Sequence, residues 1–171
     1  MAQPHVFILA AQSSDGFIAT DSNHFTDWTS KEDKELFKQL THEAGVVVMG
    51  RSTFQTLPRA LPGRKNVVYT KQSLEFDPQT TQLTDLNPAD LVKKLALEGF
   101  SKIAIIGGQQ IYDMFLKSGV VDEMYLIIEP ISFGDGIKLN LSQPGLTLHL
   151  IESRNLNSQT VLHRYKVEKG V

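Results

Sequence analysis

Short apolar runs recur along the chain, and the segments between them carry helix-start and helix-end signals. Uninterrupted apolar runs of this length are typical of strands that are covered on both faces. They occupy residues 6–12, 46–49, 66–69, 102–106 and 123–129. Helices are predicted over residues 31–41, from Asn87-Pro88 to Gly99, and over residues 109–117. A capping residue followed by proline, and glycine just past the end, are the boundary residues that helices favour.

The pattern changes near the C-terminus, where apolar and polar residues alternate. Leu146, Leu148 and Leu150 have polar neighbours, and the same spacing returns over residues 161–167 after a polar turn near Asn157. Alternation of this kind predicts an antiparallel hairpin. Residues 72–86 have no clear period, and we expect them to form a connection with one edge strand.

Strands that alternate with helices and end in a hairpin predict a single α/β domain over residues 1–171. The sheet is expected to be mixed and mostly parallel, with helices on both faces. In such folds the ligand binds at the carboxyl ends of the parallel strands. Gly50 follows one of these strands, and Gly107 and Gly108 follow another.

Composition narrows the class of protein. Hydrophobic residues make up 41% of the chain and charged residues 21%, which is ordinary for a globular protein. A formal net charge of -2 offers no basic face for nucleic acid. No apolar run approaches membrane-spanning length, and the first residues lack the features of a signal peptide. We therefore expect a cytoplasmic protein, a monomer or a homodimer, that acts on a small molecule.

Metal and thiol chemistry find no support in the residue types. The chain contains no cysteine, which excludes disulfides, thiol nucleophiles and cysteine metal sites. Its five histidines show no metal-ligand spacing. No metal site is predicted.

Asp33 is the most informative position. If residues 31–41 are helical, then Asp33 shares a face with Leu36, Phe37 and Leu40, because the spacings are three, four and seven. A carboxylate is thus placed on the stripe that should be apolar. Since an uncompensated buried charge is costly, Asp33 should have a partner, a raised pKa or a ligand.

A structural role for Asp33 is an equally good interpretation of the same residues. Ser30-x-x-Asp33 is a capping box, in which Asp33 would bond back to the start of its own helix. Thr29-x-x-Glu32 offers the same box one residue earlier and would leave Asp33 free. The sequence leaves both alternatives open.

Three glycine- or arginine-containing segments are candidate anion sites. Gly107-Gly108 ends a strand and opens a helix, where bare amides attract phosphate, although a tight turn explains a lone Gly-Gly as well. Gly50-Arg51-Ser52-Thr53 offers a guanidinium and two hydroxyls. Arg64 is suited to a bidentate carboxylate contact, or is simply a solvated arginine.

Taken together, the motifs resemble the dihydrofolate reductase family across nearly the whole chain. The matching stretches are FILAAQSSDGFIAT, a W-x4-D-x3-FK pattern from Trp28 to Lys38, VVVMGRSTF, LPGRKNVV and IAIIGGQQIYDMFL. Their order and spacing match along with their content. The resemblance implies a dihydrofolate reductase-like fold and the reaction 7,8-dihydrofolate + NADPH → tetrahydrofolate + NADP⁺.

The resemblance also implies roles for individual residues. Asp33 would grip the amidine-like edge of the pterin and promote protonation at N5. The implied substrate contacts, with Phe37 on the ring and Arg64 on the glutamate tail, are Ala11, Trp28, Phe37, Arg64 and Ile106. The implied NADPH contacts are Ala11, Ile18, Ala19, Gly50, Arg51, Ser52, Thr53, Thr70, Lys71, Ile106, Gly107, Gly108, Gln109, Gln110, Ile111 and Tyr112.

Within the NADPH set, the resemblance assigns each group a part of the cofactor. Residues 50–53 and 107–110 would hold phosphates, with Thr70 and Lys71 near the adenosine 2'-phosphate. Tyr112 would lie near the nicotinamide, and Ala11, Ile18 and Ala19 would flank that ring beneath a mobile loop over residues 13–28.

Three residues depart from the family pattern. Ile127 stands where the family usually has a threonine that supports the carboxylate and the pterin. Gln110 replaces a cofactor-binding arginine of many members, and Lys34 takes a commonly apolar position beside the substrate.

Two alternative functions follow from other features. SSDGFIAT and SGVVDEMYLIIEP resemble the reductase domain of riboflavin biosynthesis, which uses NADPH on a ribosylamino-pyrimidine phosphate. The concurrence of Asp33, Phe37 and Arg64 favours folate. Ile127 and Gln110 motivate a third hypothesis, a nucleotide-binding module without catalysis.

Overall fold

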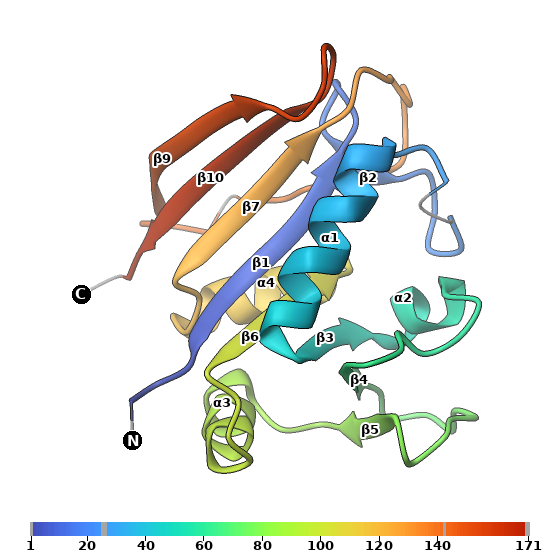
Figure 1. The fold of residues 1–171 in the computed structure, drawn as a ribbon, viewed down its shortest axis with the longest axis vertical. Helices are drawn as coiled ribbons and strands as arrows, with labels where there is room; N and C mark the ends of the chain where they lie inside the picture. The colour runs from blue at the N-terminus through green and yellow to red at the C-terminus, as the bar shows by residue number, and fades with distance from the viewer. Residues whose placement is uncertain (1, 25–26, 142, 170–171) are drawn as a thin grey trace.

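The computed structural model describes residues 2–24, 27–141 and 143–169. Its main sheet has eight strands in the order β5-β4-β3-β6-β1-β7-β10-β9. The neighbours from β5 to β7 are parallel, and β10 and β9 are antiparallel. The predicted mixed, mostly parallel sheet with a C-terminal hairpin is confirmed (Figure 1).

The strands of the main sheet follow the apolar runs of the sequence. Their bounds are β1 (His5–Gln12), β3 (Val46–Gly50), β4 (Lys65–Tyr69), β5 (Thr81–Thr84), β6 (Lys102–Gly107), β7 (Glu123–Ile128), β9 (Thr147–Asn155) and β10 (Val161–Glu168). The edge strand expected within residues 72–86 is β5. A second, two-stranded sheet joins β2 (Phe17–Ala19) to β8 (Ile137–Lys138).

Helices cover both faces of the sheet, as Figure 1 shows. They are α1 (Lys31–Ala44), α2 (Arg51–Thr56), α3 (Pro88–Leu97) and α4 (Gln109–Ser118). On one face, α1 packs through Leu36, Phe37 and Leu40 against a buried cluster that includes Ile127. On the other face, α3 and α4 bury a larger apolar cluster that includes Leu95 and Phe115. Two apolar layers therefore enclose the sheet.

The helix boundaries agree with the predicted capping signals, with one extension. Asn87 caps α3, with Pro88 in its first turn. The first helix continues past the predicted end at Thr41 to Ala44, where Gly45 has a φ of 77° and its amide donates to the Thr41 carbonyl. Only glycine adopts this left-handed conformation without strain, so Gly45 ends the helix.

Two short elements were not predicted. Helix α2 occupies a segment that is interpreted from the sequence only as a phosphate site. Its pattern does not predict a helix, because four of its six residues have weak helix propensity and no side chain caps it. Strand β8 is too short to carry a period. The run predicted over residues 123–129 ends its sheet pairing at Ile128, so Glu129 lies just beyond β7.

The parallel strands end at one edge of the sheet. The register pairs Gly50 with Tyr69 and Met49 with Gly107. On the other side of β6, β1 runs beside β7 and pairs Ala11 with Ile127. The residues that follow these strands are therefore neighbours, which is where a ligand of this fold class binds. Within the described residues, none of the helices is both long enough and apolar enough to span a membrane.

Candidate active site

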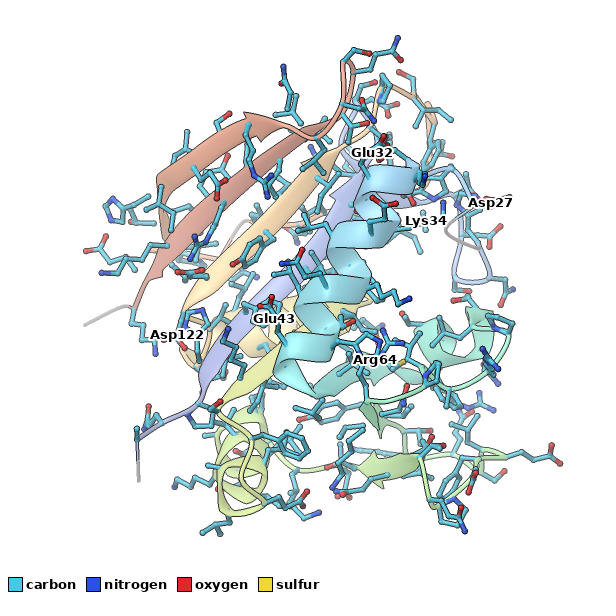
Figure 2. The ribbon with its side chains drawn as sticks, in the orientation of Figure 1. Asp27, Glu32, Lys34, Glu43, Arg64 and Asp122 are labelled. Atoms are coloured by element: carbon cyan, nitrogen blue, oxygen red, sulfur yellow. The ribbon has the colours of Figure 1, made fainter. Side chains whose placement is uncertain are left out.

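Asp33 lies in the first turn of α1 and is only 7% exposed. Burial raises its pKa to about 6; the Thr29 hydroxyl opposes the rise, the Glu129 charge adds to it, and Lys34 opposes it. Figure 2 shows Lys34 on this turn of the helix. A carboxyl group with a pKa in this range is poised to exchange a proton near neutral pH.

The capping question left open by the sequence has a specific answer. Ser30 is the N-cap, and its Oγ accepts a hydrogen bond from the Asp33 amide at 3.1 Å. The return bond of a capping box would run from the Ser30 amide to Asp33. That amide instead donates to Oε1 of Glu129 at 2.9 Å. Ser30 therefore caps the helix, and Glu129 completes the cap in place of the Asp33 carboxylate.

Apolar side chains from three elements pack together beneath α1, the helix that carries Asp33. Phe37 and Leu36 of α1 pack with Ala11 of β1 and Ile106 of β6 against the same cluster. All four are partly buried, so each keeps some surface that a ligand can contact. The predicted substrate residues Ala11, Phe37 and Ile106 thus lie on the sheet face that carries α1.

Trp28 has a different set of neighbours. Its ring lies edge-on to Phe133, with centroids 5.0 Å apart, and is stacked on His24 at 6.4 Å. The predicted mobile loop over residues 13–28 contains β2 and this aromatic cluster, and its residues 25–26 lie outside the described part of the chain. The substrate contact assigned to Trp28 stays a prediction.

Arg64 is attached to the far end of α1. Its Nη1 donates to Oγ1 of Thr41 at 2.9 Å, and its Nε donates to the Pro62 carbonyl at 2.9 Å. Figure 2 shows Arg64 beside the last turns of the helix. Thr41 lies eight residues after Asp33, about 12 Å along the helix axis. Two groups suited to binding a ligand are thus spaced along one helix.

Asn66 holds the loop that carries Arg64. It is fully buried, its Nδ2 donates to the carbonyls of Leu61 and Arg64, and its Oδ1 accepts from the Leu61 amide. A buried amide with both ends bonded fixes the backbone around it. Asn66 was read from the sequence only as the first residue of a strand.

The two predicted phosphate segments meet at adjacent strand ends. A Cβ built on Gly50 would lie 3.2 Å from Ile111 of α4, and one on Gly107 would lie 3.4 Å from Oγ1 of Thr53 and from Oη of Tyr112. The two glycines therefore keep this junction open. The Gly107–Gly108 peptide bond is cis.

The same edge offers groups that fit a dinucleotide. No side chain caps α4, so the amides at its N-terminus have no side-chain acceptor. The Arg51 Nε is buried and makes no hydrogen bond to any of the described residues. An orphaned guanidinium nitrogen beside an uncapped helix N-terminus suits an anionic ligand such as a pyrophosphate.

The remaining predicted cofactor residues surround this edge. Tyr112 is buried and donates from Oη to the Leu9 carbonyl at 2.8 Å. Burial raises its pKa above the ordinary tyrosine value, and the charge of Asp33 contributes to the rise. Gln109 bonds through its side-chain amide to the backbone of Asn140. The others are Ile18 and Ala19 in β2, exposed Ser52 and Gln110, and Thr70 with Lys71 after β4.

The family model for dihydrofolate reductase matches residues 5–133. The chain belongs to the dihydrofolate reductase family. It is also 35% identical over 132 residues to the dihydrofolate reductase of Mycobacterium leprae, covering 72% of this chain and 76% of that protein.

Solved structures with the same fold carry names that refer to riboflavin biosynthesis or pyrimidine reduction. A putative riboflavin biosynthesis protein from Shewanella superposes with a TM-score of 0.78 at 23% identity, covering 96% of this chain and 99% of that one. A pyrimidine reductase-like protein from Corynebacterium diphtheriae has a TM-score of 0.79 at 21% identity, covering 98% and 93%. At these identities the likeness concerns the fold.

The departures from the dihydrofolate reductase pattern have defined surroundings. Ile127 is fully buried in the cluster beneath α1, so β7 presents a methyl-bearing side chain there instead of a hydroxyl. Thr29 supplies a buried hydroxyl that makes no hydrogen bond to any of the described residues, and it lowers the pKa of Asp33. Lys34 is turned aside, with Nζ donating to the Thr29 carbonyl at 2.7 Å.

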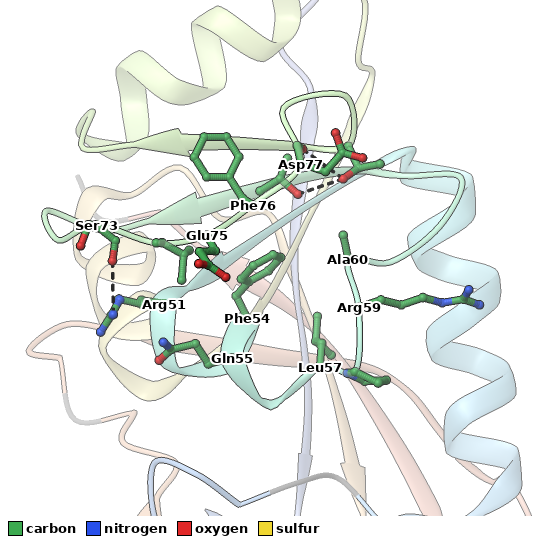
Figure 3. A pocket seen from close by; sticks show the side chains of 14 residues that line it. Arg51, Phe54, Gln55, Leu57, Arg59, Ala60, Ser73, Glu75, Phe76 and Asp77 are labelled. Atoms are coloured by element: carbon green, nitrogen blue, oxygen red, sulfur yellow. Dashed lines mark hydrogen bonds between the residues drawn. The ribbon is translucent and has the colours of Figure 1, made fainter.

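A cavity of about 820 Å³ lies beside α2, away from Asp33. Figure 3 shows Phe54 of α2 and Phe76 of the following connection at this cavity. Arg51 is the one predicted site residue in its lining, and its Nη2 donates to the Ser73 carbonyl at 3.3 Å. The cavity therefore adjoins the proposed cofactor edge rather than the substrate region.

Sequence reasoning missed Glu129, Thr29 and Asn66 as parts of the site. Glu129 was read as the last residue of a strand, although an acidic residue directly after a buried strand at the ligand edge is itself a signal. Thr29 was considered only as a cap. The side-chain amide of Asn66 bonds mostly to the backbone of the loop before it, and hydrophobic periodicity does not reveal such bonds.

Proposed function

We propose that this member of the dihydrofolate reductase family catalyses the NADPH-dependent reduction of 7,8-dihydrofolate to tetrahydrofolate. One observation carries the proposal: two ligand-binding groups lie at opposite ends of α1. At its start is the buried carboxylate of Asp33, whose pKa is raised by burial, and near its end is the guanidinium of Arg64, which donates to Thr41. Dihydrofolate has a matching shape, with a pterin at one end and a glutamate carboxylate at the other.

The pterin end of the proposal depends on Asp33. Its carboxylate would bind the amidine-like edge of the ring, and its pKa of about 6 lets it hold a proton close to neutral pH. Phe37 and the apolar side chains around it would stack on the ring and exclude water. The protein's task is to align the ring and to promote protonation at N5 while C6 receives the hydride.

The tail end depends on Arg64. Bonds from Nη1 and Nε hold the guanidinium in place, and no bond from Nη2 is found among the described residues. A planar guanidinium held in this way is preorganised for a carboxylate.

NADPH would supply the hydride when it is bound. Gly50, Arg51 and Thr53 from one strand end, together with Gly107 and the uncapped start of α4, would hold it. Tyr112 would lie beside the reacting ring because it adjoins Gly107 and its pKa responds to the charge of Asp33.

Purified protein mixed with NADPH and dihydrofolate tests the proposal directly. We expect dihydrofolate-dependent loss of NADPH absorbance and formation of tetrahydrofolate, identified by mass spectrometry. Asp33→Asn is the control, since it keeps the shape of the side chain and removes the acid. NADPH binding without turnover on either dihydrofolate or a pyrimidine would instead favour a binding module.

A second candidate is reduction of a ribosylamino-pyrimidine phosphate. It is favoured by Ile127, because the pterin would find no threonine hydroxyl at this position. It is also favoured by the whole-chain likeness to proteins named for riboflavin biosynthesis and pyrimidine reduction. Arg64 would then meet a phosphate. Offering both substrates at equal concentration with NADPH separates the two functions by their kcat/KM values.

A further inference from the structure

Glu129 is a buried carboxylate that the proposed reaction does not use. It follows β7 and is only 3% exposed. Oε1 accepts from the Ser30 amide at 2.9 Å, and Oε2 accepts from the Thr160 hydroxyl at 2.8 Å. Burying a carboxylate is costly unless its oxygens are bonded. Because both oxygens have defined donors, this is a built position.

The bond to Ser30 falls at a decisive place in α1. Ser30 is the N-cap and Asp33 is the third helical residue, which is the position whose side chain ordinarily reaches back to the N-cap amide. The amide of Ser30 is already bonded to Glu129 from 99 residues along the chain. The usual local partner for the Asp33 side chain is therefore occupied.

The C-terminal hairpin turn reinforces this arrangement. Thr160 is 1% exposed, and its amide donates to Oδ1 of Asn157 at 2.7 Å. Asn157 in turn donates from Nδ2 to Oε2 of Glu32 at 3.1 Å. The turn is thus bonded to the first turn of α1 through two carboxylates, Glu129 and Glu32, and only Glu129 reaches the N-cap.

We propose that Glu129 is a positioning residue for Asp33: it takes the backbone bond at the start of α1 that Asp33 would otherwise make, and so leaves the Asp33 carboxylate free for the substrate. The inference rests on the proposed function, because that function gives Asp33 its task.

The charges around Asp33 act in the same direction. The groups that face it are Glu129 beyond β7, Lys34 on its own helix and Tyr112 from α4. The negative charge of Glu129 raises the pKa of Asp33, whereas Lys34 lowers it. Removing Glu129 would therefore lower that pKa, and a new bond from the freed Ser30 amide would lower it further.

Two substitutions of Glu129 and one matched control test this inference. Glu129→Leu removes both the charge and the acceptor, and Glu129→Gln removes the charge but keeps an oxygen for Ser30. Glu32→Gln makes the same charge change one residue before Asp33, and its amide oxygen still accepts from Asn157. The readout is the pKa of Asp33 in the free protein, from the pH titration of its side-chain carboxyl carbon by NMR.

We expect the pKa of Asp33 to fall in Glu129→Leu from about 6 toward the ordinary aspartate value near 4. Glu129→Gln should fall less, and Glu32→Gln should keep the wild-type value. The pH profile of hydride transfer should move in the same order. An Asp33 pKa that is the same in Glu129→Leu as in the wild type overturns the inference.

A second pair of variants covers the case in which Glu129→Leu does not fold. Thr160→Val removes the hydroxyl that holds Oε2, and Thr160→Ser keeps it. We expect amide hydrogen exchange at Ser30 to speed up roughly tenfold in Thr160→Val and to stay unchanged in Thr160→Ser. Only Thr160→Val loses the charged hydrogen bond from Thr160 to Glu129, which holds that carboxylate against the Ser30 amide. Equal protection in both variants contradicts the proposal.

These readouts need no turnover, so they separate the inference from the proposed function. If dihydrofolate is not reduced while the Asp33 pKa still falls in Glu129→Leu, the reaction is wrong and the positioning role stands. If dihydrofolate is reduced and the Asp33 pKa does not move, the positioning role is wrong and the reaction stands.

Discussion

Nη1 of Arg64 donates to Oγ1 of Thr41 at 2.9 Å, which ties the guanidinium to the same helix that carries Asp33. Thr41 is fully buried, and its hydroxyl in turn donates to the Phe37 carbonyl at 2.7 Å. Because the bond starts from a rigid helix, the spacing between the carboxylate and the guanidinium is set by the fold rather than by a loop.

This arrangement predicts how Arg64 contributes to substrate affinity. Arg64→Leu should raise KM for dihydrofolate by about 10–100-fold, the value of a charged hydrogen bond. KM for a pterin without the glutamate tail should change little. Steady-state kinetics with both substrates measures the difference.

The control for Arg64 is an arginine elsewhere on the surface. Arg154→Leu makes the same change on the edge strand β9, where the arginine pairs with Glu152, and should leave KM for both substrates unchanged. If Arg64→Leu weakens both substrates equally, Arg64 does not bind the tail.

The pKa of Asp33 predicts a pH dependence of the chemical step. In the wild type the rate of hydride transfer should decline as pH rises through about 6, because Asp33 then loses its proton. Asp33→Asn should reduce the rate near pH 7 by roughly 10²–10⁴-fold, with partial recovery at low pH where the substrate is already protonated. Single-turnover kinetics across the pH range provides the measurement.

Glu35→Gln, on the exposed side of the same helix, should keep the wild-type pH profile. An Asp33→Asn variant that retained the shape of the wild-type profile would remove Asp33 from the proton transfer.

The fold and the catalytic candidate were accessible from the sequence because both depend on local pattern. Each buried run became a strand, and the three-four-seven spacing around Asp33 put a carboxylate on an apolar face, where it is indeed buried. What the pattern could not decide was whether Asp33 caps its own helix. That depended on Glu129, which is remote in sequence and reaches the Ser30 amide only in the folded chain.

The same distinction, between local pattern and contacts with remote segments, explains the other features of the site that the sequence did not predict. The partners of Arg64 are Thr41 and Pro62, and Asn66 fixes its loop through three bonds. The aromatic cluster of Trp28 depends on Phe133, which lies far along the chain. Residue type alone carries no information on which distant segment satisfies a buried polar atom or covers a ring.

Burial of Asp33 also predicts a cost to stability that depends on pH. The pKa is raised on folding, from the ordinary 3.8 to about 6, so the folded state binds the proton more tightly than the unfolded state. The free energy of unfolding should therefore fall as pH rises between about 4 and 6, by up to about 3 kcal/mol from this group. Below that range Asp33 is protonated in both states and the penalty is absent.

Asp33→Asn removes the ionisable group and should remove this penalty. We expect the variant to be more stable than the wild type at pH 8, by up to about 3 kcal/mol, with a smaller gain or none at pH 4. Urea unfolding at the two pH values provides the test, and Glu35→Gln serves as a control with an exposed charge. A gain of equal size at both pH values would show that burial of the charge is not its cause.

Gly107 offers a test of the cofactor edge that separates binding from backbone strain. Its φ is 133°, a conformation that other residues rarely adopt, and a methyl group there would point toward Thr53 and Tyr112. Gly107→Ala should lower the free energy of unfolding by about 1–3 kcal/mol. It should also weaken NADPH binding, because the methyl group fills the space left open between the two strand ends.

Gly99 has a φ of 97° and no heavy atom within 4 Å of an added Cβ, so Gly99→Ala imposes comparable strain in open space after α3. We expect the two variants to lose similar stability and only Gly107→Ala to lose NADPH affinity, measured by calorimetric titration. Backbone strain affects NADPH binding only by lowering the fraction of folded protein. Because the strain is comparable in the two variants, strain alone would weaken binding in both of them or in neither. A selective loss at Gly107 therefore requires that the added carbon meets the cofactor itself, and equal NADPH affinity in the two variants would move the binding site away from this junction.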